Sequence, residues 1–318
     1  MRTVGVDLGG TKCLAVAVEG GRVIGERRVH TPAGGTAVLD ALAAVASDVA
    51  GGAEIAGVGV GVPGLVDRGG ALRFAPNLPG VVDLPIKAEL EARLGLPVRV
   101  DNDATCATWG ERQAGAAQGY DDVVLVALGT GIGGGIVAGG HLLRGANGFA
   151  GEVGHMVLDP AGPPCPCGQR GCWERYASGG GLGRLGQAAA AEGRAARVLA
   201  LAGGDPAAVR GEHITAAAAE GDAEAQAVLA ELGRWVALGL VNLANAFDPQ
   251  AFVLGGGLVE VGDLLLAPVR AAFATLLASG AHRPPIAIVP ASLGEHAGAI
   301  GAACLFDAGG AGRVGSAP

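Results

Sequence analysis

The chain has 318 residues, half of them hydrophobic but only 3% aromatic, and it contains 59 glycines. A chain of this length can bury a sizeable core and usually folds as two domains, and this composition is typical of an α/β protein rich in turns. The formal net charge of −8 and the pI near 5.3 argue against nucleic acid or an anionic membrane as the main partner.

The sequence contains no stretch that is typical of a membrane span or a secretory leader. Asp7 interrupts the first apolar run, and the longest uncharged run, Val123–Leu143, contains seven glycines among its twenty-one residues. Three cysteines are scattered in apolar surroundings, where free buried thiols are expected: Cys13, Cys106 and Cys304. We therefore expect a cytoplasmic protein.

The first part of the chain alternates strands, tight turns and helices. Strands are predicted at 2–8, 12–18, 22–30, 55–60 and 98–100, with glycine turns at 9–11 and 20–21. Helices are predicted at 36–50, 86–94 and 104–114, with Thr36 as a candidate N-cap of the first and Gly95 closing the second. The segment between residues 61 and 85 is predicted to be a loop.

After Gly115 the pattern of the first strands begins again. A strand is predicted at 123–128, a turn at 129–135, a second strand at 136–138, and a mostly helical region at 178–247 in which Asp222 begins a long helix. Strands at 251–254 and 286–289 and helices at 263–278 and 297–306 follow. A strand, a glycine turn with a threonine and a return strand therefore occur twice, about 120 residues apart, which suggests two related halves.

Three of the six cysteines lie within eight residues, downstream of a histidine. The candidate ligands are His155, Cys165, Cys167 and Cys172. Three thiolates and one imidazole are a ligand set typical of structural zinc. A loop rich in Gly and Pro cannot hold its shape by burial, so a metal is expected to stabilise it; buried structural cysteines or a redox pair are the alternatives. Four protein ligands leave no open position for water, so we expect an architectural metal.

Both glycine turns offer backbone N–H groups and a threonine hydroxyl to a phosphate. Gly129, Gly131 and Gly134 match the spacing of the dinucleotide fingerprint, but a strand follows where that motif requires a helix. Each turn alone would be interpreted as an ordinary hairpin. Because both turns carry a threonine, Thr11 or Thr130, the sequence favours a phosphate clamp shared between two halves.

Several motifs stand in an order that resembles one family. They are Asp7-Leu-Gly-Gly-Thr-Lys12, Asn102-Asp103, Leu128-Gly-Thr-Gly-Ile-Gly-Gly-Gly135, Glu152-x-x-His155, Cys165-x-Cys167-Gly-x-x-Gly-Cys172-x-Glu174 and Gly255-Gly-Gly257. Together they resemble the ROK (repressor, open reading frame, kinase) family, most closely its zinc-containing bacterial glucokinases. The resemblance spans residues 3 to about 305.

The resemblance implies an actin-like ATPase (ribonuclease H-like) fold, in which two α/β domains with mixed sheets are hinged over a cleft. The smaller domain would comprise residues 1–116 with the C-terminal helix, 297–318, packed back onto it, and the larger would comprise residues 117–296. The implied reaction transfers the γ-phosphoryl group of ATP to the 6-hydroxyl of glucose. ATP, Mg²⁺ and structural Zn²⁺ are the implied cofactors, and a homodimer or homotetramer is the implied assembly.

The resemblance also assigns the residues around the sugar. Asp103 is the expected general base, because a sugar hydroxyl has a pKa far above 7 and its proton needs an acceptor. Alternatively, one aspartate of Asp101-Asn102-Asp103 caps the following helix and leaves the other for catalysis. The expected sugar ligands are Asn77, Asn102, Asp103, Glu152, His155 and Glu174. If zinc binds one nitrogen of His155, the other carries hydrogen and can donate to a sugar hydroxyl.

A second group of residues is expected to bind the nucleotide. The phosphates would contact Gly9, Gly10, Thr11, Gly129, Thr130, Gly131, Gly133 and Gly134. By resemblance, Gly256 and Gly257 would lie beside the nucleoside, and Asp7 would hold magnesium through water. Lys12 is either a charge partner of the phosphates or a solvated strand residue.

Other functions stay open at this point. The family also includes sugar-sensing repressors, but these add an N-terminal DNA-binding domain, whereas this chain is acidic and reaches its first phosphate strand at residue 4. A binding module without catalysis is disfavoured because Asp103 and both phosphate turns are present. Among kinases, fructose, mannose or N-acetylmannosamine could replace glucose, and polyphosphate could replace ATP.

Overall fold

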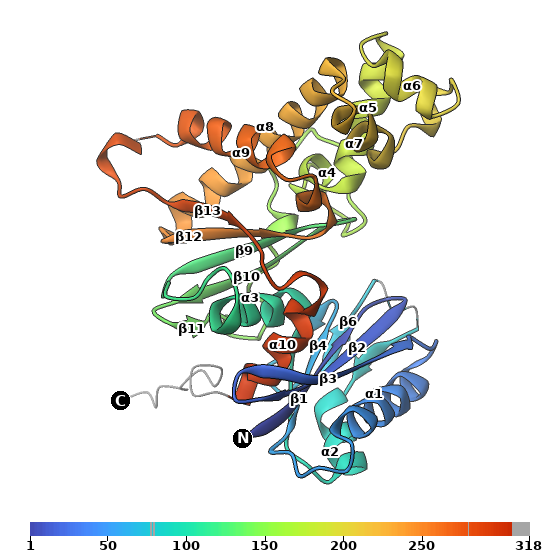
Figure 1. Ribbon diagram of the computed structural model, residues 1–318, viewed down its shortest axis with the longest axis vertical. Coiled ribbons are helices and arrows are strands. Elements are labelled where there is room, and N and C mark those ends of the chain that lie inside the picture. The colour runs from blue at the N-terminus through green and yellow to red at the C-terminus, as the bar shows by residue number, and fades with distance from the viewer. Residues whose placement is uncertain (77, 79, 279, 307–318) are drawn as a thin grey trace. The chain divides into compact units, whose positions relative to one another are not determined.

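The computed structural model describes residues 1–76, 78, 80–278 and 280–306 (Figure 1). The chain divides into two compact units. Unit 1 comprises Met1–Leu125, Gly134–Gly151 and the described part of Ala291–Pro318. Unit 2 comprises Val126–Gly133 and Glu152–Pro290.

The first sheet has the strand order β3-β2-β1-β4-β8. Its strands are β1 (Arg2–Leu8), β2 (Lys12–Glu19), β3 (Arg22–His30), β4 (Val58–Val62) and β8 (Val98–Asn102). The first three form antiparallel hairpins, whereas β1, β4 and β8 run parallel, so the sheet is mixed. The strands predicted at 2–8, 12–18 and 22–30 are confirmed within one residue.

Alternation along β1 and β4 decides what packs on each face of this sheet. Val4, Val6 and Val60 belong to a buried core with residues of α1 (Gly35–Ala50) and α2 (Ile86–Leu94). Gly5 and Gly59 point the other way, where a Cβ would collide with the backbone of α10 (Ala297–Ala303). Figure 1 shows α1 and α10 beside opposite faces of the sheet. Glycine is therefore required here by the close approach of a helix.

Two local predictions for unit 1 are wrong. Helix α1 begins at Gly35 after Gly34, so Thr36 lies inside the helix and no side chain caps its start. The segment predicted as a loop contains a three-stranded antiparallel sheet, formed by β5 (Leu65–Val66), β6 (Leu72–Phe74) and β7 (Val82–Leu84). Strands of two or three residues are too short to show an alternating pattern.

The second sheet repeats the arrangement of the first, with the order β11-β10-β9-β12-β13. Its strands are β9 (Val123–Leu128), β10 (Ile132–Ala138), β11 (His141–Leu142), β12 (Ala251–Gly255) and β13 (Ala287–Pro290). In both sheets the glycine hairpin and a third strand form one side and two later strands form the other. The repeat predicted from the two glycine turns is confirmed at the level of strand order.

The predicted turn at 129–135 is too long, because β10 already begins at Ile132. Gly135 lies in this strand and has no room for a Cβ beside Thr108 of α3 (Asp103–Ala114). A Cβ on Gly151 would lie 2.8 Å from the carbonyl oxygen of Gly134 in this strand. Gly135 and Gly151 thus permit close packing of neighbouring chain segments, and at Gly135 the chain continues as a strand.

Unit 2 is largely helical, as predicted. Its α-helices are α4 (Glu174–Ala177), α5 (Gly179–Ala191), α6 (Ala196–Leu201), α7 (Gly211–Ala219), α8 (Ala223–Phe247) and α9 (Asp263–Leu276). The 3₁₀-helices of the two units are Val153–His155, Pro206–Ala208, Gly257–Val261, Gly280–His282, Gly294–His296 and Cys304–Phe306. The predicted N-cap of α8 is confirmed, since the Asp222 carboxylate accepts the N–H of Ala225 at 2.8 Å.

Within the described residues, α8 is the one helix with the length and apolar composition of a membrane span. Of its most apolar window, 61% is buried inside the protein, and the helix packs against α9. A core helix of a globular protein has the same composition, so this helix is accounted for by burial.

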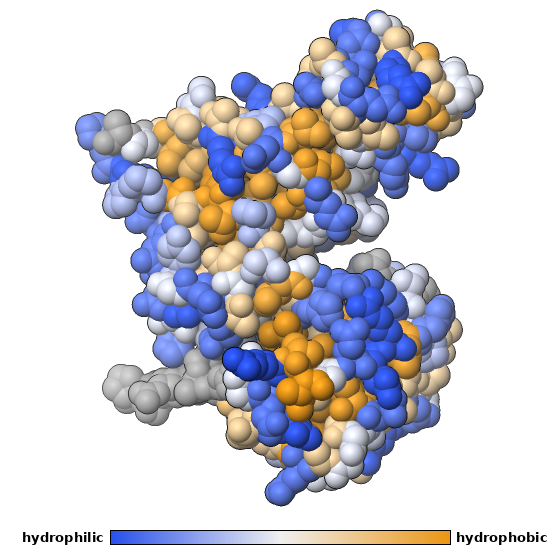
Figure 2. Space-filling model, in the orientation of Figure 1, coloured by the Kyte–Doolittle hydropathy of each residue, from blue (hydrophilic) through white to orange (hydrophobic). Residues whose placement is uncertain are grey.

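Strand β3 forms an edge of the first sheet and is almost fully exposed. Val23 and Ile24 are 41% and 49% exposed, and Figure 2 shows apolar surface on the part of unit 1 that carries this strand. The same strand carries Arg22, Glu26, Arg27 and Arg28. Charged residues on an edge strand oppose its pairing with another chain.

Candidate active site

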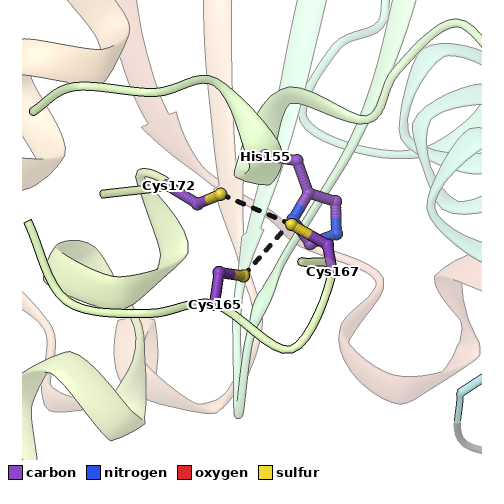
Figure 3. A group of neighbouring side chains, drawn as sticks. All are labelled: His155, Cys165, Cys167 and Cys172. Atoms are coloured by element: carbon purple, nitrogen blue, oxygen red, sulfur yellow. Dashed lines mark hydrogen bonds between the residues drawn. The ribbon is translucent and has the colours of Figure 1, made fainter. Parts of the chain in front are cut away.

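The four predicted metal ligands lie together in unit 2. The ligand atoms of His155, Cys165, Cys167 and Cys172 are all within 4.8 Å of one another, and Figure 3 shows them pointing inward. Cys165 Sγ is 3.8 Å from His155 Nδ1, and Cys167 Sγ is 3.6 Å from Cys172 Sγ. A zinc ion with Zn–S bonds of about 2.3 Å places its ligand atoms about 3.8 Å apart at tetrahedral angles. The ligand set and its spacing therefore fit zinc.

The loop that carries the cysteines is folded by short backbone contacts. Isolated bridges pair Val157 with Cys172 and Pro164 with Arg170. At the tip, the N–H of Gly168 donates to the carbonyl of Cys165 at 3.0 Å, and Gly168 has a φ of +93°. That left-handed residue reverses the chain between Cys167 and Cys172. The turn thus directs the cysteines to one point.

Trp173 joins the cysteine loop to helix α8, a contact that the sequence-based prediction missed. Its ring is fully buried, its Nε1 donates to the carbonyl of Trp235 at 2.9 Å, and it packs where Gly239 leaves no side chain. Tyr176 stacks on Trp235 with 4.3 Å between ring centroids. The signal in the sequence was the presence of two aromatic residues, Trp173 and Tyr176, within four residues of Cys172 in an otherwise aromatic-poor chain.

Two of the predicted sugar ligands, Glu152 and Glu174, flank the histidine of the cluster. Glu152 Oε2 is 3.8 Å from His155 Nε2, and Glu174 Oε1 is 4.0 Å from Nδ1. Cys165 Sγ also donates to Glu174 Oε1 at 3.1 Å. Burial raises the pKa of Glu152, as does the Glu174 charge, while His155 lowers it. The structure therefore brings Glu152, His155 and Glu174 into one polar group.

The glycine turn after β9 lies directly beside this polar group. The N–H of Gly129 donates to the carbonyl of Gly131 at 3.0 Å, and the N–H of Gly179 donates to the carbonyl of Gly129 at 2.8 Å. A Cβ on Gly131 would lie 2.6 Å from Glu174 Oε2. On the other side, Gly256 packs against the backbone of Leu128 with a φ of +84°.

The predicted phosphate residues Gly129, Thr130 and Gly131 thus form a turn next to Gly256 and Gly257, which were predicted to lie beside the nucleoside. Gly133 and Gly134, predicted in the same turn, lie in β10. Contacts with this turn come from the starts of α4 and α5 and from Gly256, directly after β12.

In unit 1, Asp7 lies near the end of β1 and is partly buried. Burial, and next the charge of Asp103, raises the pKa of Asp7 to about 7 against the opposing effect of Lys12. Gly298 of α10 lies so close that a Cβ there would be 2.7 Å from the Asp7 carboxylate. A buried carboxylate with an acidic neighbour is a site where a cation would relieve repulsion.

The turn after Asp7 is closed by backbone and side-chain hydrogen bonds. The N–H of Gly9 donates to the carbonyl of Lys12 at 2.9 Å, and Thr31 Oγ1 donates to the carbonyl of Gly9 at 2.7 Å. Gly10 and Thr11 form the exposed bend between β1 and β2. The predicted phosphate turn of unit 1 is therefore a supported hairpin with its tip open to solvent.

Lys12 has a partner that the sequence did not reveal. Its Nζ lies 2.9 Å from Glu295 Oε2, and the other oxygen of Glu295 lies 2.6 Å from Arg28 Nη2. These two basic groups, Lys12 first, lower the pKa of Glu295 to about 2. A cavity of about 60 Å³ lies beside the group, lined in part by Asp7 and Gly9.

The predicted base lies at the first residue of helix α3. The side chain of Asn102 caps this helix, accepting the N–H of Thr105 at 3.0 Å, and its Nδ2 donates to the carbonyl of Gly64 at 3.1 Å. The expectation that an aspartate would cap the helix is wrong. Asp103 Oδ1 accepts the N–H of Ala104 at 2.8 Å, so the helix start orients its carboxylate. Asn77, predicted as a further sugar ligand, lies outside the described residues.

In a comparison with known protein families, residues 3–308 match the ROK family. The glucokinase of Streptomyces coelicolor is 44% identical over 307 residues, which cover 95% of this chain and 96% of that protein. The crystal structure of a ROK family glucokinase from Streptomyces griseus in complex with glucose and AMPPNP is similar with a TM-score of 0.82 and 43% identity, covering 96% of this chain and 99% of that one. The ROK hexokinase from Thermus thermophilus has a TM-score of 0.79 and 38% identity, covering 95% and 97%.

These likenesses define the class of fold. It is the actin-like ATPase fold, here with two mixed sheets of the same strand order and helices packed around them, and the predicted fold class is confirmed. The match extends over nearly the whole chain, and the protein belongs to the ROK family. The predicted family resemblance is confirmed as well.

Proposed function

We propose that the protein is a sugar kinase that transfers the γ-phosphoryl group of ATP to the 6-hydroxyl of glucose. The observation that carries this proposal is the likeness, over 96% of the chain, to a glucokinase from Streptomyces griseus whose crystal structure contains glucose and AMPPNP. The curated glucokinase of Streptomyces coelicolor, at 44% identity, supports the same activity. We further propose a cytoplasmic location, which the scattered free cysteines suggest, and a homodimeric or homotetrameric assembly, as the family resemblance implies.

Asp103 is proposed to accept the proton of the attacking hydroxyl. A general base typically contributes about 10²–10⁴-fold to the rate, or roughly 3–5.5 kcal/mol of the barrier. The position of Asp103 at the start of α3 supports this role, because the carboxylate is oriented by a backbone N–H and not by a long flexible side chain.

The sugar is proposed to bind through Asn102, Asp103, Glu152, His155 and Glu174, with Asn77 as a further contact. In unit 2, the closeness of Glu152 and Glu174 to the His155 ring supports this assignment. Zinc, bound by His155, Cys165, Cys167 and Cys172, would supply an architectural centre with no open position for water. Because Nδ1 is the ring nitrogen that faces Cys165, Nε2 would carry the hydrogen and could donate to a sugar hydroxyl.

The nucleotide phosphates are proposed to contact the N–H groups and threonines of the turns at Gly9–Lys12 and Gly129–Gly131, with Gly133 and Gly134 at the start of β10. Asp7 would hold Mg²⁺ through water, which fits its buried carboxylate. Gly256 and Gly257 would lie against the nucleoside. Lys12 would have to leave Glu295 to approach a phosphate, since the two are paired at 2.9 Å.

The domain boundaries predicted from the resemblance, residues 1–116 with 297–318 and residues 117–296, are retained as a proposal. The compact units of the structure divide the chain at other points, including within β9 and β10.

A coupled phosphorylation assay tests the proposed function. The purified protein is given ATP or polyphosphate with glucose, fructose, mannose and N-acetylmannosamine in turn. We expect the highest kcat/KM with glucose and ATP. The Thermus thermophilus relative is named a hexokinase, so turnover of a second hexose is a specific alternative. Absence of turnover with every sugar would overturn the proposed activity and favour the sugar-sensing regulator.

A further inference from the structure

A buried ion pair includes Asp101, which lies two residues before the proposed base in the chain. Arg144 Nε donates to Asp101 Oδ2 at 2.6 Å, and the side chains of Arg144 and Asp101 are 17% and 6% exposed. The second oxygen of Asp101 accepts the N–H of Asn102 at 3.0 Å. One carboxylate therefore contacts both Arg144 and the backbone of the segment that carries Asn102 and Asp103.

Arg144 begins the loop that leads along the chain to Glu152. Its carbonyl accepts the N–H of Ala150 at 3.1 Å, which closes the loop at its base. Arg68 fastens the same loop from outside, because its Nε and Nη2 donate to the carbonyl of Gly145 at 2.8 and 2.6 Å. The carbonyl of Asn147 also accepts the N–H of Arg68 at 3.2 Å.

The ion pair thus connects two chain segments that each end at a residue with a proposed role in sugar phosphorylation. Strand β8 ends at Asn102, directly before the base, and the loop from Arg144 ends directly before Glu152. A buried ion pair is weak as a source of stability, because desolvation of both charges offsets their attraction. Its value is geometric, since a carboxylate–guanidinium contact permits few orientations.

We propose that Asp101 and Arg144 are positioning residues, which hold the Asn102–Asp103 segment and the loop before Glu152 in register for phosphoryl transfer to the sugar. This inference rests on the proposed function. Neither side chain is assigned a contact with a substrate. Displacement of a reacting group by about 1 Å can lower turnover roughly 100-fold, so loss of the pair affects kcat.

The cavity beside Arg144 supplies a direct test. A space of about 430 Å³ is lined by Arg68, His141, Arg144 and the neighbouring loop residues. Replacement of Arg144 by Ala removes the side chain that lies between this space and the Asp101 carboxylate, and we expect a guanidinium ion from solution to take its place. Restoration of turnover by guanidinium would show that the position of the charge, and not the covalent side chain, is required.

The experiment measures kcat and KM for glucose and ATP in Arg144→Ala, with and without millimolar guanidinium chloride, together with the melting temperature. Arg93→Ala is the matched control, because Arg93 is likewise an arginine of unit 1 paired with carboxylates, but its partners Asp40 and Glu89 are exposed. For Arg144→Ala we expect kcat at least about tenfold lower, KM for ATP within about twofold of the parent, and a severalfold recovery with guanidinium. Arg93→Ala should match the parent, and guanidinium should not stimulate it.

Arg144→Ala leaves a buried carboxylate without its partner and can fail to fold. The double variant Asp101→Asn with Arg144→Gln removes both charges and keeps similar shapes, so it is measured in parallel. A folded double variant with the kcat of the parent would overturn the positioning role. So would a loss of activity in Arg144→Ala that follows the melting temperature and shows no guanidinium response. If the parent phosphorylates no sugar, the proposed function fails first, and this role fails with it.

Discussion

Asp103 is the proposed general base, and the start of α3 orients its carboxylate. Asp103→Asn keeps an oxygen that can accept the N–H of Ala104 but cannot accept a proton from the sugar. We expect both substrates to bind with nearly unchanged affinity while kcat falls by at least about 100-fold. Calorimetric titration and steady-state kinetics measure the two effects separately.

Asp40→Asn, an exposed change on α1, is the control for Asp103→Asn and should keep the parent's turnover. If Asp103→Asn retains turnover close to that of the parent, Asp103 is not the base. If sugar binding is lost together with turnover, the main role of Asp103 is recognition.

The raised pKa of Asp7 predicts how the free energy of unfolding depends on pH in the absence of magnesium. Its pKa is raised from 3.8 to about 7 by burial, so the folded state holds a proton that the unfolded state has released. The unfolded state is therefore favoured as pH rises from about 4 to about 7, and the stability contribution of protonated Asp7 is lost in that window. In Asp7→Asn this dependence disappears.

The measurement is urea unfolding at pH 5 and pH 8 in buffer with a chelator. Between these pH values, the free energy of unfolding should fall by roughly 3 kcal/mol more in the parent than in Asp7→Asn. Asp40→Asn should behave like the parent. An equal change in the parent and in Asp7→Asn would show that Asp7 does not titrate in this range.

At the scale of elements, the cysteine loop is the feature whose shape is expected to depend most on a metal. Cys167 is exposed, whereas Cys165 and Cys172 are buried, so Cys167→Ser removes a ligand with little effect on packing. We expect zinc content to fall and KM for glucose to rise about tenfold or more, while nucleotide affinity changes little. Elemental analysis and binding measurements on the purified variant give these quantities.

Cys304→Ala changes a cysteine outside the cluster and should keep both the zinc and the glucose affinity of the parent. Chelation of the parent should reproduce the effect of Cys167→Ser. Unchanged glucose binding in zinc-free protein would separate the metal from sugar recognition.

The contact between the glycine turn and α4 makes a second prediction at this scale. Gly131 does not have a left-handed φ, so alanine is compatible with its backbone, but the new Cβ would lie 2.6 Å from Glu174 Oε2. We expect Gly131→Ala to displace the Glu174 carboxylate and to raise KM for glucose about tenfold, with a small change in melting temperature. Gly25→Ala, whose Cβ would make ordinary contacts at 3.9 Å, is the control.

A double-mutant cycle identifies the cause of the Gly131→Ala effect. In a Glu174→Gln background, Gly131→Ala should raise KM for glucose less than it does in the parent, because the carboxylate it displaces is already gone. Additive effects of the two changes would mean that Gly131 acts on something other than Glu174.

At the scale of the whole molecule, net charge predicts which partners are excluded. The formal charge of −8 at pH 7 disfavours contact with phosphate backbones, which attract basic surfaces. We expect no binding to duplex DNA at low salt, with or without glucose, in a mobility-shift or polarisation assay. Binding that a sugar releases would instead support the regulator alternative.

Much of the fold could be predicted from the sequence because its strands and helices carry strong local patterns. Patterns that act over a few residues were enough for several features. Alternation predicts the hairpin of β1 and β2, Gly95 predicts the end of α2, and Asp222 predicts the N-cap of α8. The small sheet of β5, β6 and β7 could not be predicted in the same way. Its strands are too short for a pattern and depend on one another for pairing.

The role of a glycine could not always be predicted from the residues next to it in the sequence. Gly129 and Gly131 do form a turn, but Gly135 lies inside β10, where Thr108 approaches so closely that there is no room for a Cβ. A glycine needed for a turn and a glycine needed for close packing look the same in one sequence. Only the neighbouring element distinguishes them.

By itself, the sequence determined the His155 and cysteine cluster that could hold a metal, the paired glycine turns, the repeat of strand, turn and strand, and the family, because these depend on residue type and spacing along the chain. Tertiary structure alone decided that Trp173 fastens the cysteine loop to α8, that Glu295 pairs with Lys12 and that Arg144 pairs with Asp101. The members of these contacts are 43 to 283 residues apart in the chain. Contacts of that kind arise from the packing of whole elements, and no local pattern of charge or hydrophobicity specifies them.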